Sequence, residues 1–326
     1  MRHLVSPLAE LWGRGISSAQ GIHLRVRLDC GAREAPTRAI HRANPPCRRI
    51  HRISPFHTKV IGTREDHPVT QTMTVASEIE EARQRLITRQ THGVERGAAS
   101  KNLLQIASGA YLELGPSWPA WQVRRTIAFA RMIWLLQSSP ELIMTLESAA
   151  LLHGLPVTGP VQQLHVVGMS ASNEPRSLPS SSGTGRQLVT VRHRFTVAES
   201  DIVTVEGIRT VSLERLILDM ARLRPAGESL PVTDAALRTL TRANRFEQQE
   251  TWTRAAPILT SLMERVEELA GHRGIRRARD VLPLSNPLSE SWGESRMRWA
   301  ALALGLPEPV TQKHVRRASL SRRPAS

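Results

Sequence analysis

The sequence predicts a mixed α/β protein of the α+β type with a helical second half. Three observations lead to this prediction: alternation of apolar and polar residues over Leu103–Leu114, further alternating strands between residues 164 and 211, and helical apolar spacing in most segments after Ser212. The chain has 326 residues, of which 40% are hydrophobic, so it can bury the cores of about two domains.

The two ends of the chain differ in composition from the region between them. Residues 1–72 mix proline with scattered arginine and histidine and follow neither a helical nor a strand period, so we expect a disordered segment or a spurious extension ahead of Met73. Residues 313–326 are similar, and we expect a disordered basic tail. Most of the formal net charge of +15 lies in these ends, so it is poor support for specific nucleic-acid binding.

Residues 73–115 are predicted to form part of a winged helix. Ser77 is placed to cap a helix that runs to about Thr91, with glutamates in its first turn and arginines further along. A tight hairpin follows within Leu103–Leu114, with its turn at Ser108–Gly109. A helix followed by a hairpin is typical of a winged helix, although the segment is short for the complete three-helix form.

Residues 116–284 are predicted to form a central α/β domain. We expect, in chain order, a helix over Ala120–Gln137, a helix from about Thr145 to Gly154, a strand over Leu164–Gly168, a loop over Ser170–Gly185, a strand over Leu188–Arg194 and a hairpin that turns at Glu206–Gly207. Ser212 then caps a helix with one apolar stripe. Helices near 232–243, 246–256, 259–270 and 273–282 complete this region.

One more helix follows Asn286. Ser291 and Glu294 have the spacing of a capping box, in which the serine and the glutamate each accept a main-chain N–H. Apolar residues then recur on one face and end at a glycine and a proline: Met297, Ala300, Ala301, Leu304, Gly305 and Pro307. This helix resembles the opening helix of a nuclease-fold domain, and we expect residues 285–312 to be a truncated form of such a domain, because no Asp or Glu follows Pro309 to complete a metal site.

Neither a signal peptide nor a membrane span is visible in the sequence. The longest apolar stretch, around Ile127–Leu136, contains Arg131 and is well short of the roughly 20 residues that a membrane span needs. Cys30 and Cys47 are too far apart for a C-x-x-C pair, which argues against a disulfide framework or a zinc knuckle. We therefore expect a cytoplasmic protein without a membrane partner.

Three segments together resemble the AbiEi-type antitoxins of type IV toxin–antitoxin systems, in the actinobacterial form that carries a Vsr-like nuclease-fold domain at its C-terminus. The segments are the hairpin LLQIASGAYLEL, the block from TLESAALLHGLPVTGPVQQLHVVG through VRHRFTVAESDIVTVEGIRTVSLERLILDMARL, and NPLSESWGES with the following GLPEP. The resemblance implies a DNA-binding winged helix, a central regulatory domain, and a role in repressing an operon or neutralising a nucleotidyltransferase-like toxin.

The resemblance also directs attention to basic residues that could contact DNA phosphates. In the winged element the candidates are Arg83, Arg85, Arg89, Arg96 and Lys101. The hairpin has Gln105, Ala107 and Ser108 where relatives carry arginines, so we expect weak binding to operator DNA. A secondary basic patch consists of Arg273, Arg276, Arg277 and Arg279, for which a solvated helix face is the alternative interpretation.

Few residues are candidates for catalysis or metal binding. Glu294 matches a glutamate on the opening helix of nuclease-like relatives, but a lone carboxylate cannot clamp a metal ion, so we regard it as a vestigial candidate with a capping role. His153, His165 and His193 follow no common ligand spacing and are expected to be hydrogen-bonded structural residues. Phosphate-loop, nucleophile-elbow and zinc-protease motifs do not occur in the sequence.

The sequence therefore predicts a DNA-binding transcriptional regulator or antitoxin-like protein without catalytic activity, cofactor or metal. Its expected partners are operator DNA and a nucleotidyltransferase-like toxin. Two alternatives stay open. One is a metal-dependent Vsr-like endonuclease whose catalytic core is truncated, and the other is a decayed gene product.

Overall fold

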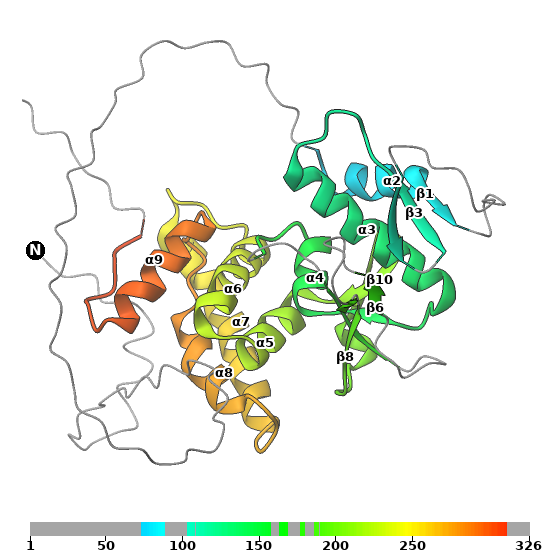
Figure 1. The fold of residues 1–326 in the computed structure, drawn as a ribbon. Coiled ribbons are helices and arrows are strands. Elements are labelled where there is room, and N and C mark those ends of the chain that lie inside the picture. Colours follow the sequence, from blue (N-terminus) through cyan, green and yellow to red (C-terminus); the bar gives the residue numbers. More distant parts are fainter. Residues whose placement is uncertain are drawn as a thin grey trace, which may run out of the picture. The chain divides into compact units, whose positions relative to one another are not determined.

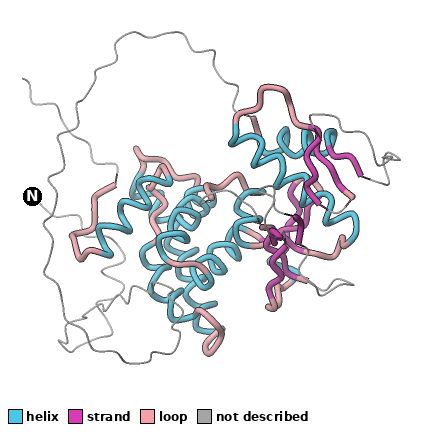
Figure 2. Tube along the Cα trace, in the orientation of Figure 1, coloured by secondary structure: helices cyan, strands magenta, loops and turns pink. Residues whose placement is uncertain are grey.

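The computed structural model describes residues 73–88, 103–107, 109–157, 163–168, 177–179, 186–188 and 190–311. Over these residues the protein has the mixed α/β fold that the sequence predicts (Figures 1 and 2), and all of them belong to one folded unit. The predictions for residues 1–72 and 313–326 lie outside the described residues.

The first described elements are a helix and a small sheet. Helix α2 spans Val75–Arg85, and strands β1 (Leu86–Thr88), β2 (Leu103–Ala107) and β3 (Ala110–Glu113) form an antiparallel sheet in the order β1-β3-β2. The hairpin predicted within residues 103–114 is thus confirmed. Strand β1 was not predicted.

The predicted helix from Ser77 to Thr91 is wrong at both ends. Thr74 is the N-cap, since its hydroxyl accepts a hydrogen bond from the Ser77 amide at 3.2 Å. The helix ends at Arg85 because Leu86–Thr88 pair with β3, and this tertiary pairing overrides the helical pattern that the sequence continues.

Helix α3 (Ala120–Ser138) covers this small sheet and agrees with the predicted helix over Ala120–Gln137. One core joins α2, the small sheet and α3 to part of the second sheet, and it includes residues on both sides of the predicted boundary at residue 115. Its largest fully buried members include Ile79, Ile106, Leu112, Phe129, Met132, Met144 and Leu164.

The second sheet has five strands in the order β8-β5-β4-β10-β9. They are β4 (Ile143–Met144), β5 (Leu164–Val167), β8 (Thr190–His193), β9 (Ile202–Val205) and β10 (Ile208–Val211). Strands β5 and β8 are parallel, as are β4 and β10, and the other neighbours are antiparallel. Parallel pairing of β5 with β8 brings residues 165 and 193 to the same part of the sheet.

Two predicted turns near this sheet are confirmed. Glu206 and Gly207 have φ of 48° and 79°, the left-handed pair that a two-residue hairpin between twisted strands requires. Helix α4 (Leu146–Leu152) ends at Gly154 with φ of 70°. The predicted loop over 170–185 contains strand β6 (Ser177–Pro179), which pairs with β7 (Arg186–Leu188).

Helices dominate the rest of the described chain (Figure 2). They are α5 (Leu213–Leu223), α6 (Ala226–Thr241), α7 (Gln248–Glu268), α8 (Ile275–Val281) and α9 (Trp292–Ala303), with short 3-10 turns at Glu199–Asp201 and Leu282–Leu284. Figure 1 shows α5, α6, α7 and α8 side by side around a second core. Ser212 caps α5 as predicted, because its hydroxyl accepts from the Arg215 amide at 3.2 Å.

Two boundaries predicted in this helical region are wrong. The helices expected over 246–256 and 259–270 are the single helix α7, which continues through Pro257. A proline removes one main-chain hydrogen bond, but Ala255, Leu259 and Leu262 form a buried stripe on both sides of it that keeps the helix in place. Helix α6 begins at Ala226 rather than near 232, with Pro231 inside it.

The buried face of α9 is not its apolar face. Ser295 and Arg298 are buried against α6, whereas Met297 and Leu304 are 72% and 76% exposed. Arg298 is buried because its guanidinium lies 2.7 Å from the carboxylate of Asp234 on α6. The buried side of this helix therefore combines a polar contact between distant segments with Trp299, which packs against the helical core.

Candidate nucleic-acid interface

Two of the five predicted DNA contacts in the winged element lie on α2, and both are engaged inside the protein. Arg83 bonds the Glu80 carboxylate at 2.9 Å and donates to the main-chain oxygen of Glu206 at 3.0 Å, so it joins α2 to the β9–β10 turn. Arg85 lies 3.3 Å from Glu81 and stacks over the Trp118 ring, 4.8 Å from its centroid. These cations are partly neutralised on the protein.

The other three candidates, Arg89, Arg96 and Lys101, lie outside the described residues. They belong to the segment between β1 and β2, which are the two outer strands of the small sheet. In the hairpin, the side-chain amide of Gln105 donates to the Ala107 oxygen at 3.3 Å. The described part of the element therefore presents Arg83 and Arg85 as its predicted basic contacts.

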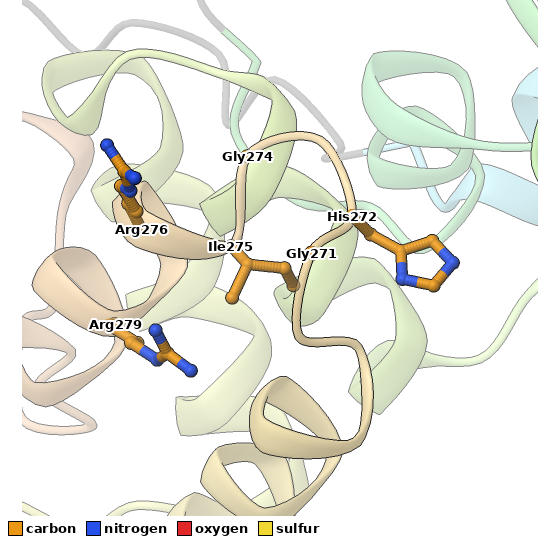
Figure 3. A pocket seen from close by; sticks show the side chains of 6 residues that line it. All are labelled: Gly271, His272, Gly274, Ile275, Arg276 and Arg279. Carbon is orange, nitrogen blue, oxygen red and sulfur yellow. The ribbon is translucent and has the colours of Figure 1, made fainter.

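The secondary basic patch lies at the turn between α7 and α8. Gly271, His272, Gly274, Ile275, Arg276 and Arg279 line a surface pocket of about 500 Å³ (Figure 3). Figure 3 shows Arg276 and Arg279 projecting from α8 while His272 points away from them. The structure thus brings two of the four predicted patch residues to one pocket.

The four arginines of the patch differ in their partners. Arg279 makes two hydrogen bonds to Glu267, at 2.9 and 2.6 Å. Arg277 donates to the main-chain oxygen of Arg222 at 3.4 Å. Arg273 and Arg276 are exposed, and among the described residues their side chains form no ion pair.

A buried network of charged side chains contacts the main chain of this turn. Arg215 on α5 lies 3.1 Å from Asp201 and 2.9 Å from Asp219, and Arg222 lies 3.4 Å from the same Asp219. Arg222 also donates to the main-chain oxygen of Arg273 at 3.4 Å. The sequence showed Arg215 and Asp219 only as polar positions on an amphipathic helix, because their partners come from distant segments.

A second polar cluster joins α4, the sheet and the end of α5. The Arg224 guanidinium makes a two-pronged hydrogen bond to the Glu147 carboxylate, and a nitrogen of it lies 3.3 Å from Nε2 of His165. Nδ1 of His165 lies 3.0 Å from Nε2 of His193. His153 is separate, with Nε2 at 2.8 Å from the Val211 oxygen. The prediction of hydrogen-bonded histidines is confirmed.

Burial controls the protonation of this cluster. It lowers the pKa of His165 to about 4, against the opposing charge of Glu147. The pKa of His193 is also lowered, first by burial and then by the positive charges of Arg224 and, more weakly, Arg273. Burial alone would raise the pKa of the Glu147 carboxyl, but hydrogen bonds and charge from Arg224 bring it below its usual value. Both shifts favour the neutral imidazoles.

Sequence reasoning did not foresee Glu147 and Arg224 as partners of the histidines. The four residues are spread over almost eighty positions, and only the parallel pairing of β5 with β8 brings the histidines together. Glu147 had one local signal, its place in the first turn of a helix. No local pattern marks Arg224, which follows the last residue of α5.

Glu294, the vestigial catalytic candidate, has a capping role. Its amide donates to the Ser291 hydroxyl at 3.2 Å, and its carboxylate accepts from the Glu290 amide at 2.8 Å. The predicted capping box is confirmed, although the carboxylate reaches the residue before the N-cap. Within the described ranges, no group of three or more His, Cys, Asp or Glu could hold a metal ion, and none of the helices could span a membrane.

Comparison with known proteins identifies no family for this chain. No protein-family model and no curated protein matches the chain. The crystal structure of JHP933 from Helicobacter pylori is 11% identical, with a TM-score of 0.32, and the match covers 58% of this chain and 97% of that one. The crystal structure of the RV2827C protein from Mycobacterium tuberculosis is 16% identical, with a TM-score of 0.31, and covers 65% and 80%.

Proposed function

We propose that this protein is a noncatalytic DNA-binding regulator of the antitoxin-like kind, which contacts duplex DNA through residues 73–115. The observation that carries the proposal is the arrangement of α2 with the three-stranded sheet β1-β3-β2, since a helix with a small antiparallel sheet and a hairpin supports a winged-helix element. The segment between β1 and β2 adds Arg89, Arg96 and Lys101 as phosphate contacts.

The internal contacts of the α2 arginines support weak binding. A phosphate that binds Arg83 has to replace the Glu80 carboxylate and the Glu206 oxygen, so part of the Coulomb gain is lost to the broken contacts. A phosphate that binds Arg85 likewise has to replace the Glu81 carboxylate. The affinity then depends more on Arg89, Arg96 and Lys101 than on the helix.

A shift assay on the protein's own upstream DNA, repeated over a range of salt, tests this surface. Each lost phosphate contact reduces the magnitude of the negative slope of log K against log salt by about 0.9, so a variant with Arg83, Arg89 and Lys101 replaced by Ala should have a slope shallower by up to roughly 2.7 and bind more weakly. Unchanged binding by this variant would exclude residues 73–115 as the contact surface.

A matched control removes the same charge elsewhere. Arg242, Arg245 and Arg254 are exposed residues of the helical half, and their triple replacement by Ala should leave affinity and slope unchanged. Thermal unfolding of both variants checks folding, since Arg83 also bonds the β9–β10 turn. Equal losses in the two variants would assign the effect to net charge alone.

We assign the second partner, a nucleotidyltransferase-like toxin, to the central region 116–284, where the longest block of the antitoxin resemblance lies. Co-expression with the adjacent gene and purification through a tag on this chain tests the assignment. An adjacent gene that does not encode such an enzyme, or a product that does not co-purify, would remove it.

The noncatalytic part of the proposal has its own test. Glu294 caps α9 with both its amide and its carboxylate, so the purified protein should not cleave duplex DNA in magnesium buffer. Cleavage that disappears on Glu294→Gln would replace this proposal by the nuclease alternative.

A further inference from the structure

The turn between α7 and α8 carries positive charge that the protein does not neutralise. Residues 272–281 contain four arginines and a single acid, Asp280. Arg279 is paired with Glu267, and Arg277 donates to the main-chain oxygen of Arg222. Arg273 and Arg276 remain exposed without an ion pair in the described part of the chain. Two exposed guanidinium groups, three residues apart in the chain, are therefore available to an anionic ligand.

Two acids of the neighbouring buried clusters are already paired with other arginines. Asp219 binds Arg215 and Arg222, and Glu147 in the histidine cluster binds Arg224. The charge of Arg273 extends to this cluster, since it contributes to the lowered pKa of His193. An ion pair between Arg273 and either of these carboxylates would therefore break an existing ion pair of another arginine.

The main chain of the turn is fixed in place. Gly271 and Gly274 adopt left-handed φ of 86° and 85°. A Cβ at Gly274 would lie 2.1 Å from the Arg222 oxygen, so α5 and the turn are in close contact. Arg222 also holds the Arg273 oxygen. A rigid support reduces the entropy that the ligand has to offset when the arginines bind it.

We propose that the turn His272–Arg277 is a second contact for the nucleic-acid backbone, in which Arg273 and Arg276 bind phosphate oxygens beside the pocket of about 500 Å³. Guanidinium groups suit this ligand because their planar N–H donors match phosphate oxygens, and such contacts position a protein on a duplex without reading its sequence. This inference rests on the proposed DNA-binding function but concerns a different surface.

Arginine footprinting of the full chain separates the two proposals. The protein is treated with phenylglyoxal with and without duplex DNA of its upstream sequence, and modification of each arginine is measured by peptide mass spectrometry. Arg242, which is exposed and follows α6, outside the turn, is the internal control. We expect the DNA to protect Arg273 and Arg276 several-fold and to leave Arg242 unchanged.

Each pattern of protection has a distinct meaning. Protection of Arg89 without Arg273 and Arg276 would overturn the second contact and keep the proposed function. Protection of Arg273 and Arg276 without Arg89 would keep the second contact and remove the winged element as the main surface. Absence of protection, or equal protection of Arg242, would overturn both.

Salt dependence gives an independent measure. Replacing Arg273 and Arg276 by Ala should make the negative slope of log K against log salt shallower by roughly 1.8, because each contact contributes about 0.9 to its magnitude. The loss should be the same for the upstream duplex and for a duplex of shuffled sequence, since backbone contacts carry no sequence information. A slope equal to that of the unaltered protein would contradict the proposal.

Discussion

The carboxylate of Asp234 on α6 lies 2.7 Å from the guanidinium of Arg298 on α9, and both side chains are 1% exposed. The Ser295 hydroxyl and the main-chain N–H of Asn286 donate to the same carboxylate, at 2.7 and 2.8 Å. Arg298 also donates to the Leu284 oxygen. The segment before α9 and the helix itself are thus attached to α6 through one buried acid.

Replacing Arg298 by Met should destabilise the protein strongly, because it leaves the Asp234 carboxylate buried without its cation. Breaking a buried ion pair in this way costs about 3–5 kcal/mol in the free energy of unfolding. Urea unfolding measures the loss. Arg296→Met on the same helix is the control, since Arg296 stacks on the Trp292 ring and forms no ion pair among the described residues, and its effect should stay within about 0.5 kcal/mol. Equal urea midpoints for the two variants would contradict this account of α9.

Alanine substitutions at Gly271 and Gly274 separate the cost of steric contact from the cost of a left-handed backbone, because the two residues have nearly the same φ, 86° and 85°. Alanine at Gly271 meets nothing within 4 Å and should cost about 1–2 kcal/mol for the left-handed conformation alone. Alanine at Gly274 places Cβ 2.1 Å from the Arg222 oxygen, so we expect a further loss of about 2 kcal/mol or more from the displaced main chain. Thermal unfolding of the two variants tests this order, which a similar loss in both would refute.

The capping box of α9 predicts unequal effects from its two members. Ser291→Ala removes the acceptor of the Glu294 amide and should lower stability by about 1 kcal/mol. Glu294→Gln keeps an oxygen that can accept from the Glu290 amide, so its effect should stay within about 0.5 kcal/mol. Chemical unfolding of both variants checks the difference. A larger loss from Glu294→Gln would mean that the negative charge has a role beyond capping.

Acid should destabilise the protein through His165, whose pKa falls from 6.5 to about 4 on folding. Between these values the unfolded chain binds the proton and the folded chain does not. The contribution of neutral His165 to the free energy of unfolding is therefore fully present above pH 6.5. It is lost as the pH falls toward 4, by at most roughly 3 kcal/mol. The lowered pKa of Glu147 acts with the same sign at still lower pH.

Urea midpoints at pH 7 and pH 5 test this dependence. His165→Gln should reduce the difference between the two midpoints, because it removes the titrating group. His272→Gln should leave the difference unchanged, since His272 is exposed at the turn before α8. If His165→Gln retains the full pH dependence, the loss arises elsewhere.

Local signals in the sequence predicted much of the fold. The Glu206–Gly207 turn, the caps at Ser212 and Ser291, and the end of α4 at Gly154 are each determined within a few residues, and the structure confirms them. The errors come where distant segments decide. Leu86–Thr88 is a strand because β3 pairs with it, and α7 continues through Pro257 because its buried stripe extends on both sides.

The candidate sites follow the same division. The basic turn was visible as a run of arginines, but the sequence could not show that Arg279 is paired with Glu267 whereas Arg276 is not. The cluster of Glu147, His165, His193 and Arg224 depends on a parallel strand pair and a helix end, so no spacing rule could have assembled it.

The hydrogen bond from Arg83 to the Glu206 oxygen has a thermodynamic consequence. The Arg83 guanidinium joins α2 to the β9–β10 turn, so a phosphate that binds Arg83 weakens the attachment of this turn to α2. By reciprocity, a ligand of the turn that withdraws the Glu206 oxygen would free this cation for DNA, and the two binding free energies would be coupled by the same amount in both directions.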